Sequence, residues 1–350
     1  MTRGLTRFES GSVVVAVALA AAAGALDVAG ARNTAVFVTS GVALVALAWV
    51  VGIATEQLGE SAGPKVGGVL NATFGNAAEL IITIFAVRAG ELEVATASIT
   101  GSILGNTLLV LGASLLVGGL RNGVQTFDQR VAGMNASMLA LAVIGLGLPT
   151  AFAAARGTGG DVQTISDVTA AILLALYALS LLYYFRSGAG GHAPTGAAHW
   201  TARVAMGLLL ASTAGVAVVS DVFVGTISGA ISDLGIAPAF LGLVIVPIVG
   251  NIAENIVGIK IAYENRMDFS MLVSLGSSLQ VALGVAPILV FVSLATPHDF
   301  DLVFPTIQVL ALAAAVTITA LIALDGESNW LEGAQLIAVY LIIATAFWYL

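Results

Sequence analysis

Long apolar stretches follow one another along almost the whole chain, separated only by short polar segments. A helix needs about 20 apolar residues to cross roughly 30 Å of hydrocarbon. We therefore expect an all-α polytopic membrane protein with no long soluble domain. The pattern predicts eleven membrane-spanning helices, near residues 11–30, 34–54, 66–88, 94–119, 131–154, 165–185, 203–225, 238–260, 269–294, 302–324 and 332–350.

The composition agrees with a chain that is surrounded mostly by lipid. Of its 350 residues, 59% are hydrophobic and 9% are charged, against about 25% charged residues in soluble domains. The net charge of −8 argues against a nucleic-acid partner, which needs a basic surface. Because the chain has no cysteine, disulfides, thiolate zinc sites and thiol catalysis are excluded. The lipid bilayer is the expected partner, and the sequence indicates no oligomeric state.

The first apolar stretch has two interpretations. Arg3 and Arg7 precede an alanine-rich run with small residues near Ala25, which also fits a cleaved signal peptide. The run is long for a signal and no soluble domain follows, so we favour a retained helix. Most lysines and arginines fall on one side when the N-terminus is placed inside, which predicts a cytoplasmic N-terminus and an outer C-terminus. The expected location is a prokaryotic inner or plasma membrane.

A short block of sequence occurs twice, in the same register, 175 residues apart. The first copy reads "GNAAELI" and the second reads "GNIAENI", and a separate Gly-Ser pair repeats at the same offset. Two matched blocks in one register are hard to attribute to chance, even in a glycine-rich chain. The matched positions are Gly67 and Gly242, Gly75 and Gly250, Asn76 and Asn251, Glu79 and Glu254, Gly101 and Gly276, and Ser102 and Ser277.

The repeat predicts the organisation of the whole chain. Each half contains five spans, and an odd number places the second half upside down relative to the first. Many secondary transporters follow this inverted-repeat plan, with the substrate site near the midplane. We expect an extra helix at 1–30, a first repeat at 31–186, a linker at 187–200 and a second, inverted repeat at 201–350. The linker is rich in Gly, Ala and Pro, which is typical of a loop.

The matched glutamates are the main functional candidates, because each lies near the middle of an apolar span. A carboxylate at that depth is costly and marks a functional site by default. Each glutamate could instead be a protonated structural acid, but two glutamates at matching positions of the repeat favour a functional role. Asn76 and Asn251 precede Glu79 and Glu254 by three residues, so each pair shares a helix face. The preceding glycines, Gly75 and Gly250, permit local breaks that free backbone carbonyls.

The neighbouring spans supply further oxygen ligands. One carries a polar stripe of Ser98, Ser102 and Asn106, and another carries several serines together with Gln280. Such serines can serve as packing contacts between helices or as ligands, and coordination is favoured where they match across the repeat. The resulting donor set contains only oxygen, which suits Ca²⁺. Two carboxylates hold either one dication or about two protons, and this competition is the basis of an antiporter.

These motifs resemble the cation/proton exchanger family of the calcium/cation antiporter superfamily. The resemblance covers nearly the whole chain from the second span, through "NATFGNAAELI", "GSILGNTLLVLG", "VPIVGNIAEN" and "GSSLQVALGVAP". It implies eleven helices, exchange of cytosolic Ca²⁺ for external protons, and no enzymatic activity or resident cofactor. The residues that it implies for the cation site are Glu79 and Glu254, which also couple to protons, with Asn76, Asn251, Ser102, Ser277, Gln280, Gly75 and Gly250.

The chain departs from the family pattern in three places, and other functions stay open. Asn255 stands where the family often has His, Gly105 stands where many relatives have Ser, and the acidic segment that often joins the halves is missing. A Na⁺/Ca²⁺ exchanger is the nearest alternative, although such proteins tend to carry Thr- and Ser-rich blocks around the acid. A passive channel fits less well, since one acid in each inverted half favours alternating access. An intramembrane hydrolase also fits less well, because the predicted spans contain no His/Asp/Ser or metal-binding His constellation.

Overall fold

The computed structural model describes residues 5–62, 67, 70–71, 73–157, 160–187 and 199–350. Within these residues, nine helices are long and apolar enough to cross a membrane. The prediction of an all-α polytopic membrane protein is confirmed. A further apolar helix, Thr306–Ile322, is shorter, and the span predicted at 66–88 begins in residues outside the description, so the number eleven stays a prediction. Most of the predicted linker also lies outside the described residues.

The chain divides into two compact units. The first unit consists of Met1–Ala89, Ser180–Ile236 and Ile248–Ala253. Its complete helices are α1 (Arg7–Val28), α2 (Asn33–Ala62), α4 (Ala77–Ala89), α9 (Ala202–Gly225) and α10 (Ile227–Leu234).

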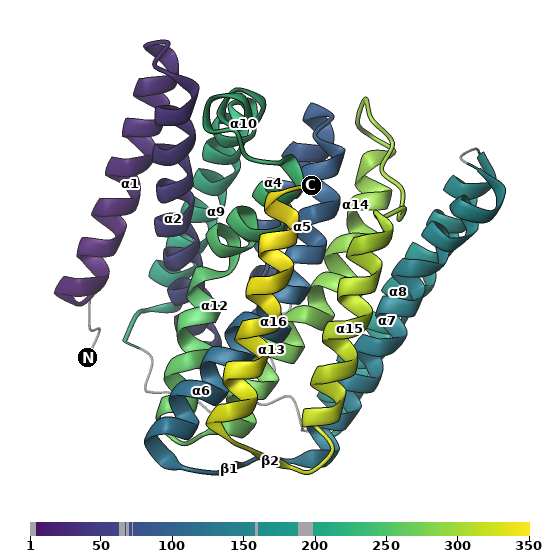
Figure 1. Cartoon of the computed structure of the whole chain (residues 1–350). Coiled ribbons are helices and arrows are strands. Elements are labelled where there is room, and N and C mark those ends of the chain that lie inside the picture. Colours follow the sequence, from purple (N-terminus) through teal and green to yellow (C-terminus); the bar gives the residue numbers. More distant parts are fainter. Residues whose placement is uncertain (1–4, 63–66, 68–69, 72, 158–159, 188–198) are drawn as a thin grey trace. The chain divides into compact units, whose positions relative to one another are not determined.

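Small residues allow α2 and α9 of the first unit to pack closely. A side chain at Gly41 would contact the ring of Phe223, and one at Gly215 would contact Leu47. Phe37 stacks on Phe223 with 4.7 Å between ring centroids. The helix α1 lies beside α2 in Figure 1. Aromatic stacking and glycine contacts therefore hold α2 and α9 together as one packed pair.

Trp200, at the start of the second half of the sequence, connects α1 and α2. Its indole N–H donates to the carboxylate of Glu9 at 3.0 Å, and its backbone N–H donates to Gln57 Oε1 at 3.2 Å. The backbone N–H of His199 donates to the same Gln57 oxygen at 2.8 Å. Glu9 also closes a capping box with Thr6 at the beginning of α1. These three hydrogen bonds thus join three segments that are distant in sequence.

The second unit consists of Gly90–Leu179, Ala237–Pro247 and Glu254–Leu350. Helix α8 begins in the second unit and ends in the first, whereas α12 begins and ends in the second unit and contributes Ile248–Ala253 to the first. The remaining elements are α5 (Leu92–Leu104), η1 (Gly105–Val110), α6 (Leu111–Asn122), β1 (Gln125–Thr126), α7 (Gln129–Arg156), α8 (Gly160–Ser187), α11 (Pro238–Phe240), η2 (Leu241–Ile245), α12 (Val246–Tyr263), α13 (Met267–Gln280), η3 (Val281–Val285), α14 (Ala286–Ser293), α15 (Thr306–Ile322), β2 (Glu327–Ser328) and α16 (Trp330–Trp348).

Close backbone contacts hold the interior of the second unit together. A Cβ at Gly101 on α5 would lie 2.1 Å from the carbonyl oxygen of Leu243, and one at Gly112 would lie 3.0 Å from the carbonyl oxygen of Gly333. Only glycine fits at the distance found for Gly101, and a side chain at Gly112 would need its neighbours to shift, so α5 lies directly on η2 and α6 lies close against α16. At one end of this unit, β1 and β2 pair antiparallel, with Gln125 opposite Ser328 (Figure 1).

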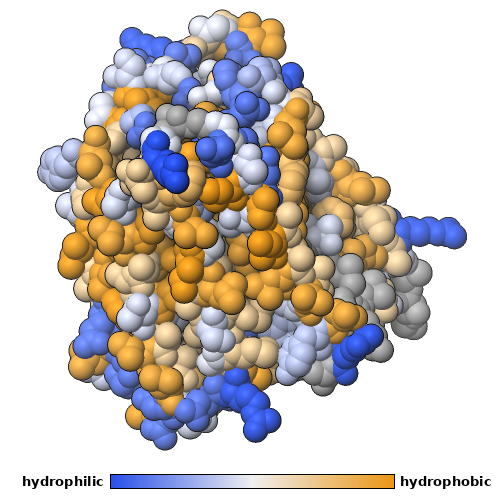
Figure 2. Space-filling view, turned by 90° about the vertical axis from the view of Figure 1, so that its right-hand side faces the viewer, coloured by the Kyte–Doolittle hydropathy of each residue, from blue (hydrophilic) through white to orange (hydrophobic). Residues whose placement is uncertain are grey.

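The outer faces of α7 and α8 are apolar. Figure 2 shows the side on which these helices lie in Figure 1, with hydrophobic side chains across its middle and hydrophilic ones gathered toward both ends. This distribution is typical of a surface that faces lipid. Exposed apolar side chains on these helices include Leu141, Ile144, Leu148, Val168, Ile172 and Leu179.

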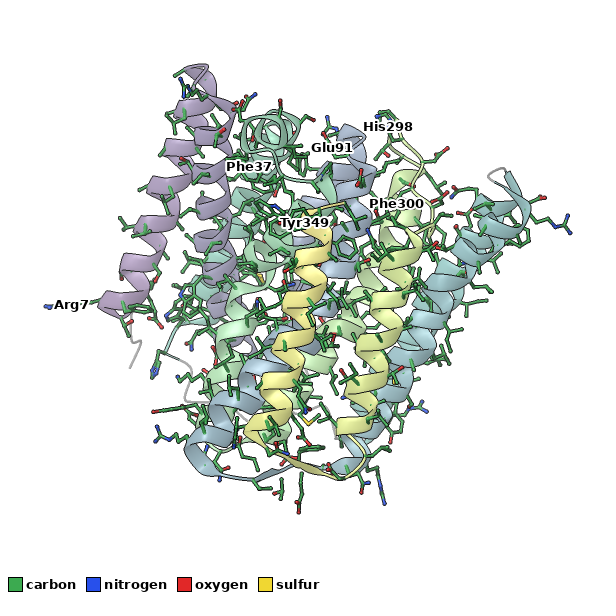
Figure 3. The ribbon with its side chains drawn as sticks, viewed as in Figure 1. Arg7, Phe37, Glu91, His298, Phe300 and Tyr349 are labelled. Atoms are coloured by element: carbon green, nitrogen blue, oxygen red, sulfur yellow. The ribbon has the colours of Figure 1, made fainter. Side chains whose placement is uncertain are left out.

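A loop joins α14 to α15 at one end of the second unit. In Figure 3, its residue His298 lies at the same end as Glu91, just before α5. Gly90 has a φ of +82°, and a Cβ there would lie 3.0 Å from the imidazole of His298. The backbone N–H of Phe300 donates to the hydroxyl of Ser293 at 3.0 Å. The positive φ therefore favours glycine at residue 90, and the absence of a side chain also leaves room for His298.

Three π-helical segments interrupt the helices of the second unit. The segment η1 follows α5 directly, and η3 follows α13 directly. The two occupy nearly matching positions of the repeat, because an offset of 175 carries Gly105–Val110 onto residues 280–285. The third, η2, precedes α12. Short π segments inside α-helices are rare and often occur at functional sites, and here each directly follows or precedes a helix with a matched motif.

Candidate cation site

The backbone before the first glutamate is interrupted. Gly75 and Asn76 form a turn, and α4 begins at Ala77, so Glu79 lies in the first turn of that helix. The N-terminus of a helix favours a nearby carboxylate because unpaired backbone N–H groups point toward it. Glu79 is fully buried and Asn76 is nearly so. The local break that Gly75 permits is therefore present, immediately before the acid.

The backbone before the second glutamate is not interrupted at the matching position. The helix α12 runs without a break through Gly250, Asn251 and Glu254, and its irregular part is η2, before Val246. A Cβ at Gly250 would lie 3.2 Å from Cβ of Glu79. Here the glycine allows α12 to approach the backbone of α4, and it does not form a turn as Gly75 does. The break expected at Gly250 is therefore absent.

Within the first unit, Glu79 is held by a residue from the second copy of the motif. The side-chain amide of Asn251 donates to Glu79 Oε2 at 3.2 Å, and both side chains are buried. Thr83 donates its hydroxyl to the backbone oxygen of Glu79 at 2.8 Å, which fixes the first turn of α4. A hydrogen bond from an amide to an ionised carboxylate is stronger than one between neutral groups.

Within the second unit, Glu254 belongs to a short hydrogen-bonded chain. The hydroxyl of Ser277 on α13 is hydrogen-bonded to the carboxyl group of Glu254. The side-chain amide of Asn106 on η1 donates to the same hydroxyl oxygen at 2.9 Å. Among the described residues, Glu254 Oε2 is buried without a hydrogen-bond partner. A buried, unsatisfied carboxylate oxygen is costly unless a proton or a cation neutralises it.

The remaining predicted ligands lie on elements that flank these acids in sequence. Ser102 is fully buried on α5, and Gln280 is the half-buried last residue of α13. Gly75 and Asn76 form the turn before α4. Contact with a cation stays a prediction for each of these residues. In the described parts of the chain, no group of three or more His, Cys, Asp or Glu side chains is placed to hold a metal ion.

Asn106 is bonded to a candidate ligand, Ser277, but the matched motifs did not select it. It belongs to the polar stripe with Ser98 and Ser102, but residue 281, its counterpart in the repeat, is a valine. A search for matched residues therefore passes over it. The signal in the sequence was its spacing of four residues from Ser102, which places it on the same helix face.

Comparison with known proteins places this chain among cation exchangers. The family model described as sodium/calcium exchanger protein matches residues 32–186 and 204–349. A Ca²⁺/H⁺ antiporter of Synechocystis is 40% identical over 345 residues, which cover 91% of each chain. The Ca²⁺/H⁺ antiporter ChaA of Bacillus subtilis is 40% identical over 318 residues, with 88% of this chain and 90% of the relative covered.

Solved structures show the same fold. The structure of native YfkE matches with a TM-score of 0.85 and 37% identity, over 97% of this chain and all of the other. The crystal structure of the H⁺/Ca²⁺ exchanger CAX matches with a TM-score of 0.76 and 17% identity, over 98% of this chain and 93% of the other. The resemblance to cation/proton exchangers is thereby confirmed, and the chain belongs to the sodium/calcium exchanger family.

Proposed function

We propose that this protein is a Ca²⁺/H⁺ antiporter that exports cytosolic Ca²⁺ in exchange for protons. The observation that carries the proposal is the hydrogen bond from Asn251 to Glu79. Asn251 precedes Glu254 by three residues in the unbroken helix α12, and residues three apart share a helix face. The first acid is thus bonded to the helix that carries the second. Relatives with 38–40% identity that bear the name Ca²⁺/H⁺ antiporter support the same activity.

The proposed mechanism rests on competition for two carboxylates. Glu79 and Glu254 together balance the charge of one Ca²⁺, which prefers six to eight oxygen ligands. Asn76, Asn251, Ser102, Ser277 and Gln280 would supply neutral oxygens, and the carbonyls near Gly75 and Gly250 would add others. When the cation leaves, two carboxylates in a medium of low dielectric take up protons. The site then carries either Ca²⁺ or protons across the membrane, but not both.

Alternating access requires elements that move past the site. The helices α2 and α9 begin the two predicted repeats, and their close packing around Phe37 and Phe223 supports treating them as one moving pair. With the N-terminus in the cytoplasm, as the distribution of basic residues predicts, Ca²⁺ would be released at the outer side. Inverted repeats that rock around a fixed site are the general plan for such transport.

Uptake of Ca²⁺ into everted membrane vesicles tests the proposal. An imposed acid-inside pH gradient, without sodium, should drive uptake by the wild type, and a protonophore should abolish it. Glu79→Gln and Glu254→Gln should each reduce uptake to background, because one neutralised acid leaves the dication uncompensated. The matched control is Glu93→Gln on the exposed face of α5, which should transport normally.

Each alternative gives a different result in the same vesicles. A requirement for sodium would indicate a Na⁺/Ca²⁺ exchanger, and flux without either gradient would indicate a channel. Normal transport by either acid variant would contradict the assigned site. The amount and the unfolding temperature of each purified variant show whether a loss of transport reflects a loss of folded protein.

A further inference from the structure

Asn106 is buried in the second unit and is bonded to a proposed ligand. It is 3% exposed, and it lies at the second position of η1. Its side-chain amide donates to the hydroxyl oxygen of Ser277 at 2.9 Å, and this hydroxyl is hydrogen-bonded to Glu254. The two bonds form a chain from the first copy of the repeated sequence to the acid of the second copy.

The chemistry of a serine hydroxyl decides what this chain does. A hydroxyl has one hydrogen to donate and two lone pairs to accept, and it rotates to suit its surroundings. The amide of Asn106 can only donate through its nitrogen, so it occupies a lone pair of Ser277. With that lone pair occupied, the hydroxyl can donate its hydrogen to the carboxylate of Glu254. Asn106 therefore fixes the direction of the second hydrogen bond as well as the position of the oxygen.

We propose that Asn106 is a positioning residue for cation binding, which acts through the hydroxyl of Ser277 on the carboxylate of Glu254. The inference rests on the proposed function, because it assumes that Glu254 binds the transported cation. The proposed role exists in the first repeat only, because the matching residue of the second repeat, residue 281, is a valine. Without the amide, the Ser277 oxygen loses the bond that fixes it from the side of η1, and Glu254 is held less firmly in one orientation for Ca²⁺.

Thr107, the residue after Asn106, offers a comparison within the same segment. Asn106 belongs to the π segment that follows α5, whereas its neighbour Thr107 donates its hydroxyl to the backbone oxygen of Ile103 at 2.6 Å. Thr107 is also fully buried and contributes to the same segment without a bond to Ser277. Thr107→Val is therefore a matched control, because it removes a buried polar bond from η1 and leaves the Asn106–Ser277–Glu254 chain intact.

A double-mutant cycle on the initial rate of Ca²⁺ uptake tests the proposal. The variants are Asn106→Leu, Ser277→Ala and the two combined, in vesicles driven by a pH gradient. Asn106→Leu should raise the KM for Ca²⁺ by about tenfold and change kcat by less than about twofold, with Thr107→Val near the wild type. The double variant should be no worse than Ser277→Ala alone, because Asn106 acts only through Ser277. Asn106→Gln, which keeps the amide donor, should recover part of the KM.

The outcomes separate this inference from the proposed function. A wild type that takes up no Ca²⁺ under the pH gradient overturns the proposed function. An active wild type whose KM is unchanged by Asn106→Leu overturns only the role of Asn106, and effects that multiply in the double variant make Asn106 a direct ligand. Asn106→Ala, which is too small to cause a clash, should raise KM as Asn106→Leu does. A fall in kcat or in unfolding temperature at unchanged KM indicates a purely structural residue and overturns the proposal.

Discussion

The two copies of the repeated motif have the same sequence pattern but different backbones. In the first copy, Gly75 and Asn76 form a turn, and Glu79 stands at the start of α4. In the second copy, Gly250 and Glu254 lie inside the continuous helix α12. The same glycine thus serves a turn in one copy and a close helix contact in the other. Matching residues can share a chemical role while their local structures differ.

The hydrogen bonds of the two acids differ as well. Glu79 accepts from the amide of Asn251, which belongs to the other copy. Glu254 is bonded to a hydroxyl of its own copy, Ser277, which in turn accepts from Asn106 of the other. In each case, a residue of one copy supports the acid of the other. Substitutions at matching positions should therefore have unequal effects on stability and on the KM for Ca²⁺.

The largest difference is expected at the Gly-Ser pair. A Cβ at Gly101 would lie 2.1 Å from the backbone oxygen of Leu243 and 2.5 Å from its Cα, whereas one at Gly276 meets nothing within 4 Å. Gly101→Ala should separate α5 from η2 and lower the unfolding temperature by roughly 5–10 °C, or prevent folding. Gly276→Ala should stay within about 2 °C of the wild type. Thermal unfolding of the two purified variants measures the difference, and equal shifts would contradict it.

The sequence predicts the candidate residues of the site better than it predicts the backbone conformation around them. The offset of 175 residues identifies both acids, their asparagines and the glycines, because these residues are matched in pairs. It does not show that Gly250 faces Glu79, since that contact depends on how α12 packs on α4. The π segments also escape prediction, because their residues are ordinary apolar helix formers. The offset also passes over Asn106, because its counterpart is Val281. The role proposed for Asn106 therefore rests on its contact with Ser277 and not on the repeat.

A smaller effect is expected at the asparagine that supports the first acid. Asn251→Leu removes the donor to Glu79 and should raise the KM for Ca²⁺ uptake by about tenfold, since bonds to charged groups contribute about 1.5–3 kcal/mol. The matched control is Asn122→Leu, because the Asn122 amide donates to backbone oxygens of Ala262 and Tyr263 instead of a carboxylate. The control should leave KM within about twofold of the wild type. Equal KM values for Asn251→Leu and the wild type would remove Asn251 from the site.

The smallest effect is expected where α12 approaches α4. A Cβ at Gly250 would lie 3.2 Å from Cβ of Glu79 and 3.4 Å from its Cα, so α4 must shift by a few tenths of an ångström. Gly250→Ala should raise the KM for Ca²⁺ about threefold, because a small displacement weakens the oriented bond from Asn251. Gly258→Ala, in the same helix, meets only ordinary contacts, the nearest with Val110 at 3.5 Å.

A comparison of Gly250→Ala with Gly258→Ala separates the effect of the contact between α12 and α4 from the effect of helix propensity. Alanine is the better helix former at both positions by about 1 kcal/mol, so both variants gain the same local stabilisation. A rise in KM at Gly250 alone therefore reports the approach of α12 to Glu79. If both variants keep the KM of the wild type, the glycine of the second copy is not needed for that approach. The difference between the copies would then lie in the turn at Gly75 alone.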